Sequence, residues 1–333
     1  MDPDFWLPLF FAGAMGLALL VYVVLDGYDL GIGLLLPFAN DHEKDLMIAS
    51  IGPFWDANET WIVLGIGILL IAFPQAHGQI LTAMYIPVTL MLMGLILRGI
   101  AFDFRAKAIA HKKDMWNAIF SIGSLITASA QGWMLGTYIT GLGHSGISYL
   151  FSVLIALTLP ALYILLGAAW LLIKTEDALF DKALSWAKKA ILPMGLALLL
   201  VSVATPLVSQ TIADKWFSFP DGLKLLPIPL LSTAVFTSLL WLLFDQRVLR
   251  EQGREWLLFG GLILLCVLAS LGLAYSILPD IIIGQMTIWE SASSTKSLMF
   301  TFWGTAVVLP AIIVYTFFVY RIFSGKTTTL TYE

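Results

Sequence analysis

The sequence predicts an all-α protein: a polytopic membrane helical bundle of nine transmembrane helices that forms a single integral membrane domain, residues 1–333. Residues of the AVILMFWYC set make up 59% of the chain and charged residues 12%, and the mean hydropathy is +0.90. Soluble proteins contain about 25% charged residues, so this composition excludes a soluble globular enzyme. The apolar residues form continuous runs, unlike the alternating strands of a membrane β-barrel.

Nine apolar segments can each supply the roughly 20 residues that a membrane-spanning helix requires. The first is expected to continue helically to Leu36, bent by Gly27, Gly31 and Gly33. The connections are too short for a separate soluble domain. The sequence starts with the acidic stretch MDPD, whereas a cleavable signal peptide starts with basic residues, so no such peptide is predicted. The segments lie near 5–25, 50–73, 79–101, 116–140, 149–173, 189–210, 225–244, 256–279 and 298–320.

The second segment differs from the others because its apolar part is short. Residues 62–73 are continuously apolar, and these 12 residues cannot cross a bilayer. The helix must therefore begin earlier and carry Asp56, Asn58 and Glu59 inside or at the edge of the membrane. A charged side chain at the bilayer centre costs roughly 2.5–3.5 kcal/mol, so we expect Asp56 to be drawn into low-dielectric surroundings for a functional reason.

Basic residues predict the orientation, because Lys and Arg are retained on the cytoplasmic side. Connections after odd-numbered segments, with the C-terminal tail, hold 14 of the 18 basic residues, those after even-numbered segments hold 3, and Arg98 lies within the third segment. The N-terminus is therefore expected in the periplasm and the C-terminus in the cytoplasm. The 14 residues are Lys44, Arg105, Lys107, Lys112, Lys113, Lys174, Lys182, Lys188, Lys189, Arg247, Arg250, Arg254, Arg321 and Lys326.

Acidic residues at membrane depth are the candidates for chemistry. Pairs in the first and second segments have an i,i+3 spacing, which puts both side chains on one helix face. Carboxylates suit proton transfer because burial and a neighbouring like charge can raise their pKa. The set therefore predicts a proton relay or a cation site. The alternative is structural, with each acid paired to an arginine or capping a helix. The proton-path candidates are Asp26, Asp29, Asp56, Asn58, Glu59 and Asp103, with Arg98 and Arg105 as charge partners.

Histidine and cysteine usage predicts no redox centre and no metal site in this chain. A membrane haem takes its axial ligands from helix interiors, whereas all four histidines fall in or beside connections. The single cysteine, Cys266, lies in an apolar run and excludes an internal disulfide and a multi-thiolate metal site. The histidines are His42, His77, His111 and His144.

The polar segment WESASST at 289–295 precedes the last apolar segment on the outer side. Serine and threonine cap helices, and Glu290 suits a first helical turn. Capping is the expected role, with a substrate contact as the alternative.

Four motifs, in this order on nine helices, give the chain a resemblance to subunit II of cytochrome bd-type quinol oxidases over essentially its whole length. They are DGYDLGIG at 26–33, WDANETW at 55–61, Arg98-x4-Asp103-Phe-Arg105, and WESASS at 289–294. The better-known branch of the family reads HWDGNQVW at the second motif. The present form, with Glu59 where that branch has an amide, is similar to the cyanide-insensitive-type branch.

The resemblance implies a subunit without its own redox centre in a bacterial inner-membrane complex that oxidises quinol and reduces oxygen to water without pumping. The family's subunit I carries the quinol site, two haems b and one haem d. Subunit II is implied to support subunit I and to supply protons from the cytoplasm, contributing to the proton motive force. A bound quinone and a small single-helix subunit occur in some members. Lipid and quinol are the other expected partners, whereas no nucleic-acid partner is expected.

Two other functions compete with an oxidase subunit. A proton-coupled transporter would use the same carboxylates, but transporters more often show two similar halves with broken helices, and no such symmetry is visible. A scaffold without proton transfer would make every acid structural. Co-purification with a haem-bearing partner separates the oxidase subunit from the transporter, and turnover after substitution of the acids separates it from the scaffold.

Overall fold

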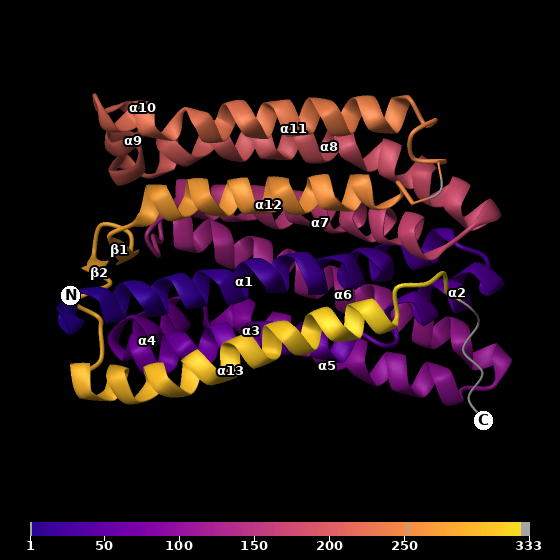
Figure 1. The fold of residues 1–333 in the computed structure, drawn as a ribbon, viewed down its shortest axis with the longest axis horizontal. Coiled ribbons are helices and arrows are strands. Elements are labelled where there is room, and N and C mark those ends of the chain that lie inside the picture. Colours follow the sequence, from indigo (N-terminus) through magenta and orange to yellow (C-terminus); the bar gives the residue numbers. More distant parts are fainter. Residues whose placement is uncertain (1, 252, 328–333) are drawn as a thin grey trace.

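The computed structural model describes residues 2–251 and 253–327. Within these residues nine helices are long and apolar enough to cross a membrane, as the sequence predicted. In Figure 1 they run along one common axis, and the two chain ends lie at opposite ends of the bundle. The nine are α1 (Pro3–Leu35), α3 (Trp55–Ala72), α5 (Tyr85–Lys107), α6 (Ala110–Ile139), α7 (Gly146–Lys174), α8 (Asp177–Val208), α11 (Pro227–Phe244), α12 (Trp256–Ile277) and α13 (Thr295–Ile322).

Short elements cover the two ends of the bundle (Figure 1). At the end that carries the N-terminus lie α4 (Pro74–Ala83), α9 (Gln210–Phe217), α10 (Asp221–Leu225) and the strands β1 (Asp280–Ile282) and β2 (Met286–Thr287). These strands pair antiparallel, with Asp280 opposite Thr287, in a hairpin that the apolar pattern did not predict. At the opposite end, the 3-10 turn η1 (Leu36–Phe38) leads into α2 (Asp41–Ile51).

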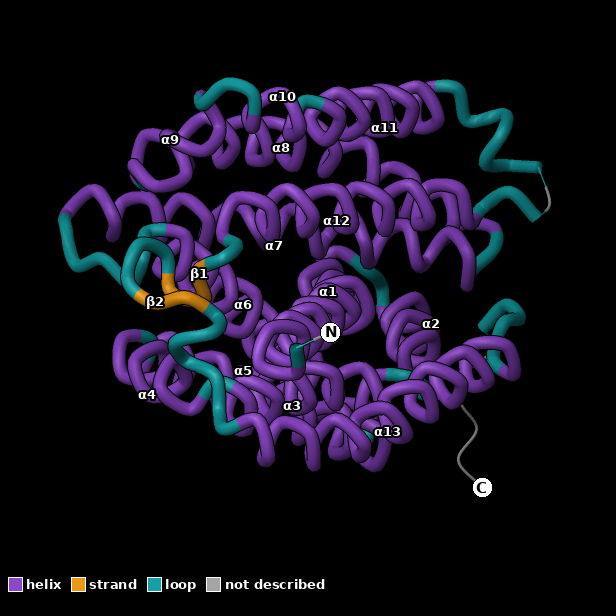
Figure 2. The backbone as a smooth tube through the Cα atoms, turned by 60° about the vertical axis from the view of Figure 1, so that its left-hand side comes forward, coloured by secondary structure: helices purple, strands orange, loops and turns teal. Residues whose placement is uncertain are grey.

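Helix α1 is the central helix of the bundle. It contacts α2, α3, α6, α7, α12 and α13, and Figure 2 shows it surrounded by these helices. The helix continues to Leu35, as expected, before the chain tightens into η1. A Cβ atom built on Gly167 of α7 would lie 2.6 Å from the carbonyl carbon of Gly31. The glycines therefore let the α1 and α7 backbones touch, which is how membrane helices gain packing contacts.

Two helix boundaries differ from the sequence prediction. The third span begins at Tyr85 rather than near residue 79, because Pro74–Ala83 forms the separate helix α4. Pro87 lies in the first turn of α5, where a missing N–H costs no hydrogen bond. The sixth span begins at Asp177 rather than near residue 189, since the hydropathy pattern marks the apolar part of a helix and not its polar extension. Lys182 and Lys188 are therefore helical.

Helix α13 lies at the edge of the bundle, against α1 and α3. Leu298 is its one buried residue among those that the structure describes. Its N-terminal end is attached to α1, because Trp289 stacks on Phe5 with ring centroids 5.5 Å apart and donates from Nε1 to the Phe5 carbonyl oxygen. Near its C-terminal end, the hydroxyl of Tyr320 reaches the buried Asn58 of α3.

Candidate functional site

Arg98 on α5 is the centre of a buried ionic cluster. It is fully buried, and its Nη2 donates to Asp26 Oδ1 and, at 2.5 Å, to Glu59 Oε1. Asp26 on α1 is also fully buried, whereas 23% of the Glu59 side chain on α3 is exposed. One guanidinium therefore joins three helices. Removing one partner of a buried ion pair typically costs roughly 3–5 kcal/mol because a charge is left uncompensated.

Asp29 lies one helical turn after Asp26 and is held by a different group. Asn58 Nδ2 donates to Asp29 Oδ2 at 2.8 Å and to the Tyr28 hydroxyl at 2.9 Å. The Tyr320 hydroxyl of α13 donates to Asn58 Oδ1 at 3.0 Å and lies 2.6 Å from the Tyr28 hydroxyl. Helices α1, α3 and α13 therefore meet at Asn58, which is 1% exposed.

A third group extends the polar interior away from Asp26. Tyr22 precedes Asp26 by one turn of α1, so the two share a helix face. Gln131 Nε2 of α6 donates to the Tyr22 hydroxyl at 2.6 Å, and the Tyr163 hydroxyl of α7 donates to Gln131 Oε1 at 2.5 Å. All three side chains are buried. The ionic cluster is therefore continuous with a row of neutral hydrogen-bonding groups.

Four buried polar atoms of the cluster have no hydrogen-bond partner among the described residues: Asp26 Oδ2, Asp29 Oδ1, and Nε and Nη1 of Arg98. Buried polar groups are nearly always paired, and an unpaired one is costly. Three carboxylates also face a single guanidinium, so the cluster holds more acids than bases.

Asp56 and Asp103 do not join the cluster. Both are exposed on this chain, although Asp56 was expected in low-dielectric surroundings. Asn58 marks the buried face of α3, and Asp56, two residues earlier, points to the opposite side. Of the expected charge partners, Arg98 pairs with Asp26 and Glu59, and neither Arg98 nor Arg105 is paired with Asp103 in the described structure. Residues five or two positions apart do not share a helix face, and Arg105 instead contacts Asn117 Oδ1 at 2.5 Å and Asp45 Oδ1 at 2.7 Å.

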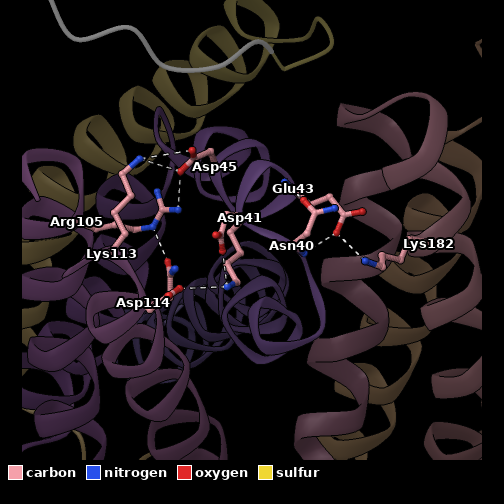
Figure 3. Close-up of polar contacts among 10 residues, drawn as sticks. Asn40, Asp41, Glu43, Asp45, Arg105, Lys113, Asp114 and Lys182 are labelled. Atoms are coloured by element: carbon pink, nitrogen blue, oxygen red, sulfur yellow. Dashed lines mark hydrogen bonds and ion pairs between the residues drawn. The ribbon is translucent and has the colours of Figure 1, made fainter. Parts of the chain in front are cut away.

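Helix α2 is held to the end of the bundle by a second set of charges (Figure 3). Lys182 of α8 donates to Glu43 Oε2 at 2.6 Å, and the Asn40 side chain and Glu43 form a capping box at the start of α2. Partial burial opposes the ionised form of Glu43, but the hydrogen bonds from Lys182 and the Asn40 N–H outweigh it and lower the pKa of this carboxyl.

The other face of α2 is attached to α5 and α6. Asp45 accepts from Arg105 Nη2 at 2.7 Å and from Lys113 Nζ at 3.3 Å, and these two cations lower its pKa against the effect of partial burial. Lys44 contacts Asp41 at 3.0 Å and Asp114 at 3.3 Å. Together with the contact between Glu43 and Lys182 of α8, these contacts join α2 to three membrane-spanning helices (Figure 3).

The donor set of the described residues does not fit a haem or a metal ion. His42 and His144 are exposed, and His77 lies on α4 outside the nine spans. The side chain of His111 lies outside what the structure describes. Among the described residues no three His, Cys, Asp or Glu side chains are grouped as metal ligands. The buried Asp26 and Asp29 face an arginine, which is unsuited to a cation site.

The segment before α13 has the capping role that its composition suggested. The Ser294 side chain accepts from the Ser297 N–H at 3.4 Å. Glu290 does not lie in the first turn of α13; it accepts from the N–H and hydroxyl of Thr287 at 2.7 and 2.9 Å, which lowers the pKa of this exposed carboxyl. Thr295 Oγ1 donates to Asp4 at the start of α1.

In the part of the chain that the structure describes, nine helices long and apolar enough to cross a membrane surround a buried acid–arginine cluster, which defines a multi-pass membrane protein with an ionisable site at membrane depth. The chain belongs to the cytochrome bd terminal oxidase subunit II family, whose model matches residues 7–323. It is a protein of the bacterial inner membrane and a component of a quinol oxidase complex. The resemblance in the four sequence motifs is therefore confirmed.

Known relatives cover most of the chain. Cytochrome bd-I ubiquinol oxidase subunit 2 of Escherichia coli strain K12 is 26% identical over 359 aligned positions, which cover 94% of this chain and 93% of that protein. Cytochrome bd ubiquinol oxidase subunit 2 of Bacillus subtilis strain 168 is 32% identical over 182 positions, covering 50% of this chain and 54% of that protein. A chain of the bd oxidase from Geobacillus thermodenitrificans has the same fold, with a TM-score of 0.76 and 16% identity over 95% of this chain and 98% of that chain.

Proposed function

We propose that this chain supplies protons from the cytoplasm to a haem-bearing partner subunit, in which quinol is oxidised and oxygen is reduced to water. The observation that carries this proposal is the buried cluster of Asp26, Asp29, Glu59 and Arg98, which has more carboxylates than arginines and retains unpartnered polar atoms. Reducing oxygen to water consumes one proton for each electron, so an oxidase with a buried oxygen site needs such a path. Family membership favours this function over a transporter.

The position of the cluster supports proton entry from one side. Asp26 lies nine residues before the end of α1, which places it about 14 Å from that end at 1.5 Å per residue. This end of the bundle also carries α2 and the C-terminus (Figure 1). Most basic connections belong to the same end, which we assign to the cytoplasm. The exposed Asp56 and Asp103 are the outer groups of the proposed path, and Glu59, partly exposed, links them to Arg98.

The partner holds the redox chemistry in this proposal. The family resemblance implies two haems b and one haem d there, and these groups would accept electrons from quinol and pass them to oxygen. The part of this chain would be to orient its carboxylates, exclude bulk water and move protons between Asp29, Asp26 and Glu59. Because the path would take protons from one side only, the complex would separate charge without pumping.

The test uses the oxidase complex purified through a tag on this chain. We expect a haem spectrum and quinol:oxygen turnover from the co-purified partner. Asp29→Asn keeps the hydrogen bond from Asn58 but cannot carry a proton, so it should assemble with normal haem content and lose most turnover. Asp181→Asn, at an exposed acid on α8 paired with Arg250, is the matched control and should turn over normally. An assembled Asp29→Asn complex with wild-type oxygen uptake would refute the proton role of Asp29.

A further inference from the structure

We infer that Tyr320 and Tyr28 are positioning residues that hold the Asn58 side chain against Asp29, so that Asp29 exchanges its proton through Oδ1. The sequence predicted no role for either tyrosine, although Tyr28 lies within the motif at 26–33, and Tyr320 lies on α13, 292 residues away from Tyr28 along the chain. The inference deepens the proposed function and rests on it, because it assigns the oxygen of Asp29 that serves the proton path.

Three side chains form a closed ring of hydrogen bonds. Asn58 Nδ2 lies 2.9 Å from the Tyr28 hydroxyl, the Tyr28 hydroxyl lies 2.6 Å from the Tyr320 hydroxyl, and the Tyr320 hydroxyl lies 3.0 Å from Asn58 Oδ1. Tyr28 is fully buried, and its ring stacks on Trp170 with centroids 4.3 Å apart. The ring of hydrogen bonds is therefore held in place by packing at Tyr28 and by helix α13 at Tyr320.

Because Asn58 Nδ2 faces Asp29 Oδ2, counting donors gives the direction of every bond in this ring. An amide oxygen only accepts, so the hydroxyl hydrogen of Tyr320 points to Asn58 Oδ1. The Tyr28 oxygen accepts from Asn58 Nδ2, and its own hydrogen must then go to the Tyr320 oxygen. The second hydrogen of Asn58 Nδ2 remains for Asp29 Oδ2 at 2.8 Å, with the more distant Leu25 carbonyl oxygen at 3.3 Å as its other acceptor.

Asp29 disfavours the opposite orientation of the amide. That orientation would place Asn58 Oδ1 against Asp29 Oδ2, so two acceptors would face each other in a buried site. Both tyrosine hydroxyls would still be satisfied, because the hydrogen bonds of the ring would only reverse their direction. Asp29 therefore sets the orientation of the amide, and the two tyrosines hold the Asn58 side chain beside it, with Oδ2 of Asp29 occupied by a donor. Among the described residues Asp29 Oδ1 has no hydrogen-bond partner, and it is the oxygen open to a proton.

The test compares Tyr320→Phe with Asp29→Asn in the purified complex. Without the Tyr320 hydroxyl, Asn58 Oδ1 loses its donor and the side chain is held less firmly, so Asp29 loses a steady donor to its ionised form. We expect Tyr320→Phe to lose turnover about fivefold and to move the pH profile of turnover by roughly 0.7 units to higher pH, which is the effect of losing one hydrogen bond of ordinary strength. The carboxyl infrared band that disappears in Asp29→Asn should also move in Tyr320→Phe.

Two further variants make the outcome decisive. Tyr315→Phe, at an exposed tyrosine of the same helix, should leave turnover, pH profile and infrared band as in the wild type. Tyr28→Phe removes the bond to Tyr320 and carries the same test if Tyr320→Phe does not assemble with normal haem content. A Tyr320→Phe complex that is slower but keeps the wild-type pH profile and Asp29 band would overturn the inference, and so would a wild-type complex without an Asp29 band.

Failure of the proposed function gives a different result. If Asp29→Asn turns over like the wild type, the proton path through Asp29 is wrong. The infrared band then decides only whether Tyr320 holds Asn58 against Asp29: a band that moves in Tyr320→Phe supports this positioning, and an unmoved band overturns it.

Discussion

Two charged regions of this molecule lie near the same end of the bundle and are built in opposite ways. Around α2, acids and bases are matched: Glu43 with Lys182, and Asp45 with Arg105 and Lys113. Around Arg98, Asp26 and Glu59 share one guanidinium, Asp29 relies on an amide, and four buried atoms have no partner among the described residues. The first arrangement fixes a helix in place, and the second is the one through which we propose that protons pass.

The strongest test of this contrast removes the shared cation. Arg98→Met leaves buried carboxylates without a counter-charge, and we expect a loss of roughly 3–5 kcal/mol of stability. The measurement is the yield and haem content of the complex purified through this chain. Arg254→Met, at an exposed arginine paired with Glu251, should retain both. Normal assembly of Arg98→Met would show that the cluster does not depend on its arginine.

A milder change in the interior removes one charge and keeps the shape. Glu59→Gln retains an oxygen that accepts from Arg98 but cannot transfer a proton. We expect normal assembly and about a fivefold loss of turnover, smaller than the loss in Asp29→Asn, because the partly exposed position admits water as a substitute. Oxygen uptake measured across pH checks this. A loss of haem in Glu59→Gln would instead mark Glu59 as structural.

In the α2 region the corresponding change should affect stability and not turnover. Glu43→Gln weakens both the capping box and the contact with Lys182, and we expect a loss of about 1 kcal/mol. Thermal unfolding of the purified complex measures this loss, and oxygen uptake below the unfolding temperature should match the wild type. Reduced turnover at full haem content would show that α2 belongs to the proton path.

The smallest expected effect is the acid dependence of the α2 region. The folded-state pKa values of Glu43 and Asp45 are lowered, so their contribution is present above the unfolded pKa values of about 4.3 and 3.9. It is lost as the pH falls through the lower folded values. The effect is a small drop in melting temperature, because both groups are partly exposed. The double variant Glu43→Gln/Asp45→Asn should lose less stability than the wild type between neutral and acid pH. If its melting temperature falls with pH as steeply as that of the wild type, Glu43 and Asp45 are not the groups responsible.

Much of this architecture could be predicted from local patterns. The nine spans followed from hydropathy, and the i,i+3 spacing of Asp26 and Asp29 predicted that they share one face of the first helix, which is buried in α1. The shortness of the apolar run 62–73 correctly extended α3 back over Asn58 and Glu59. These features depend on helix periodicity and membrane thickness, which act within one segment of the chain.

The remaining features depend on contacts between segments. Hydropathy could not reveal that Arg98 faces α1 and α3 rather than Asp103, because the direction of a side chain follows from how the helices are rotated. Tyr320 looks like an interfacial tyrosine in the sequence, and only the position of α13 brings it to Asn58. Gln131 was the one missed residue with a visible signal, since an amide within an apolar span needs a hydrogen-bond partner.

The contact between Tyr28 and Tyr320 has a consequence for biosynthesis. The first helix of the chain carries Tyr28 and the last carries Tyr320, so the ring around Asn58 can close only after translation has reached the final membrane helix. A nascent or truncated chain that ends before α13 leaves Asn58 Oδ1 without its hydroxyl donor and Asp29 without a firmly held donor. The site is therefore completed by the last helix to be inserted, which makes its closure a marker of a full-length subunit.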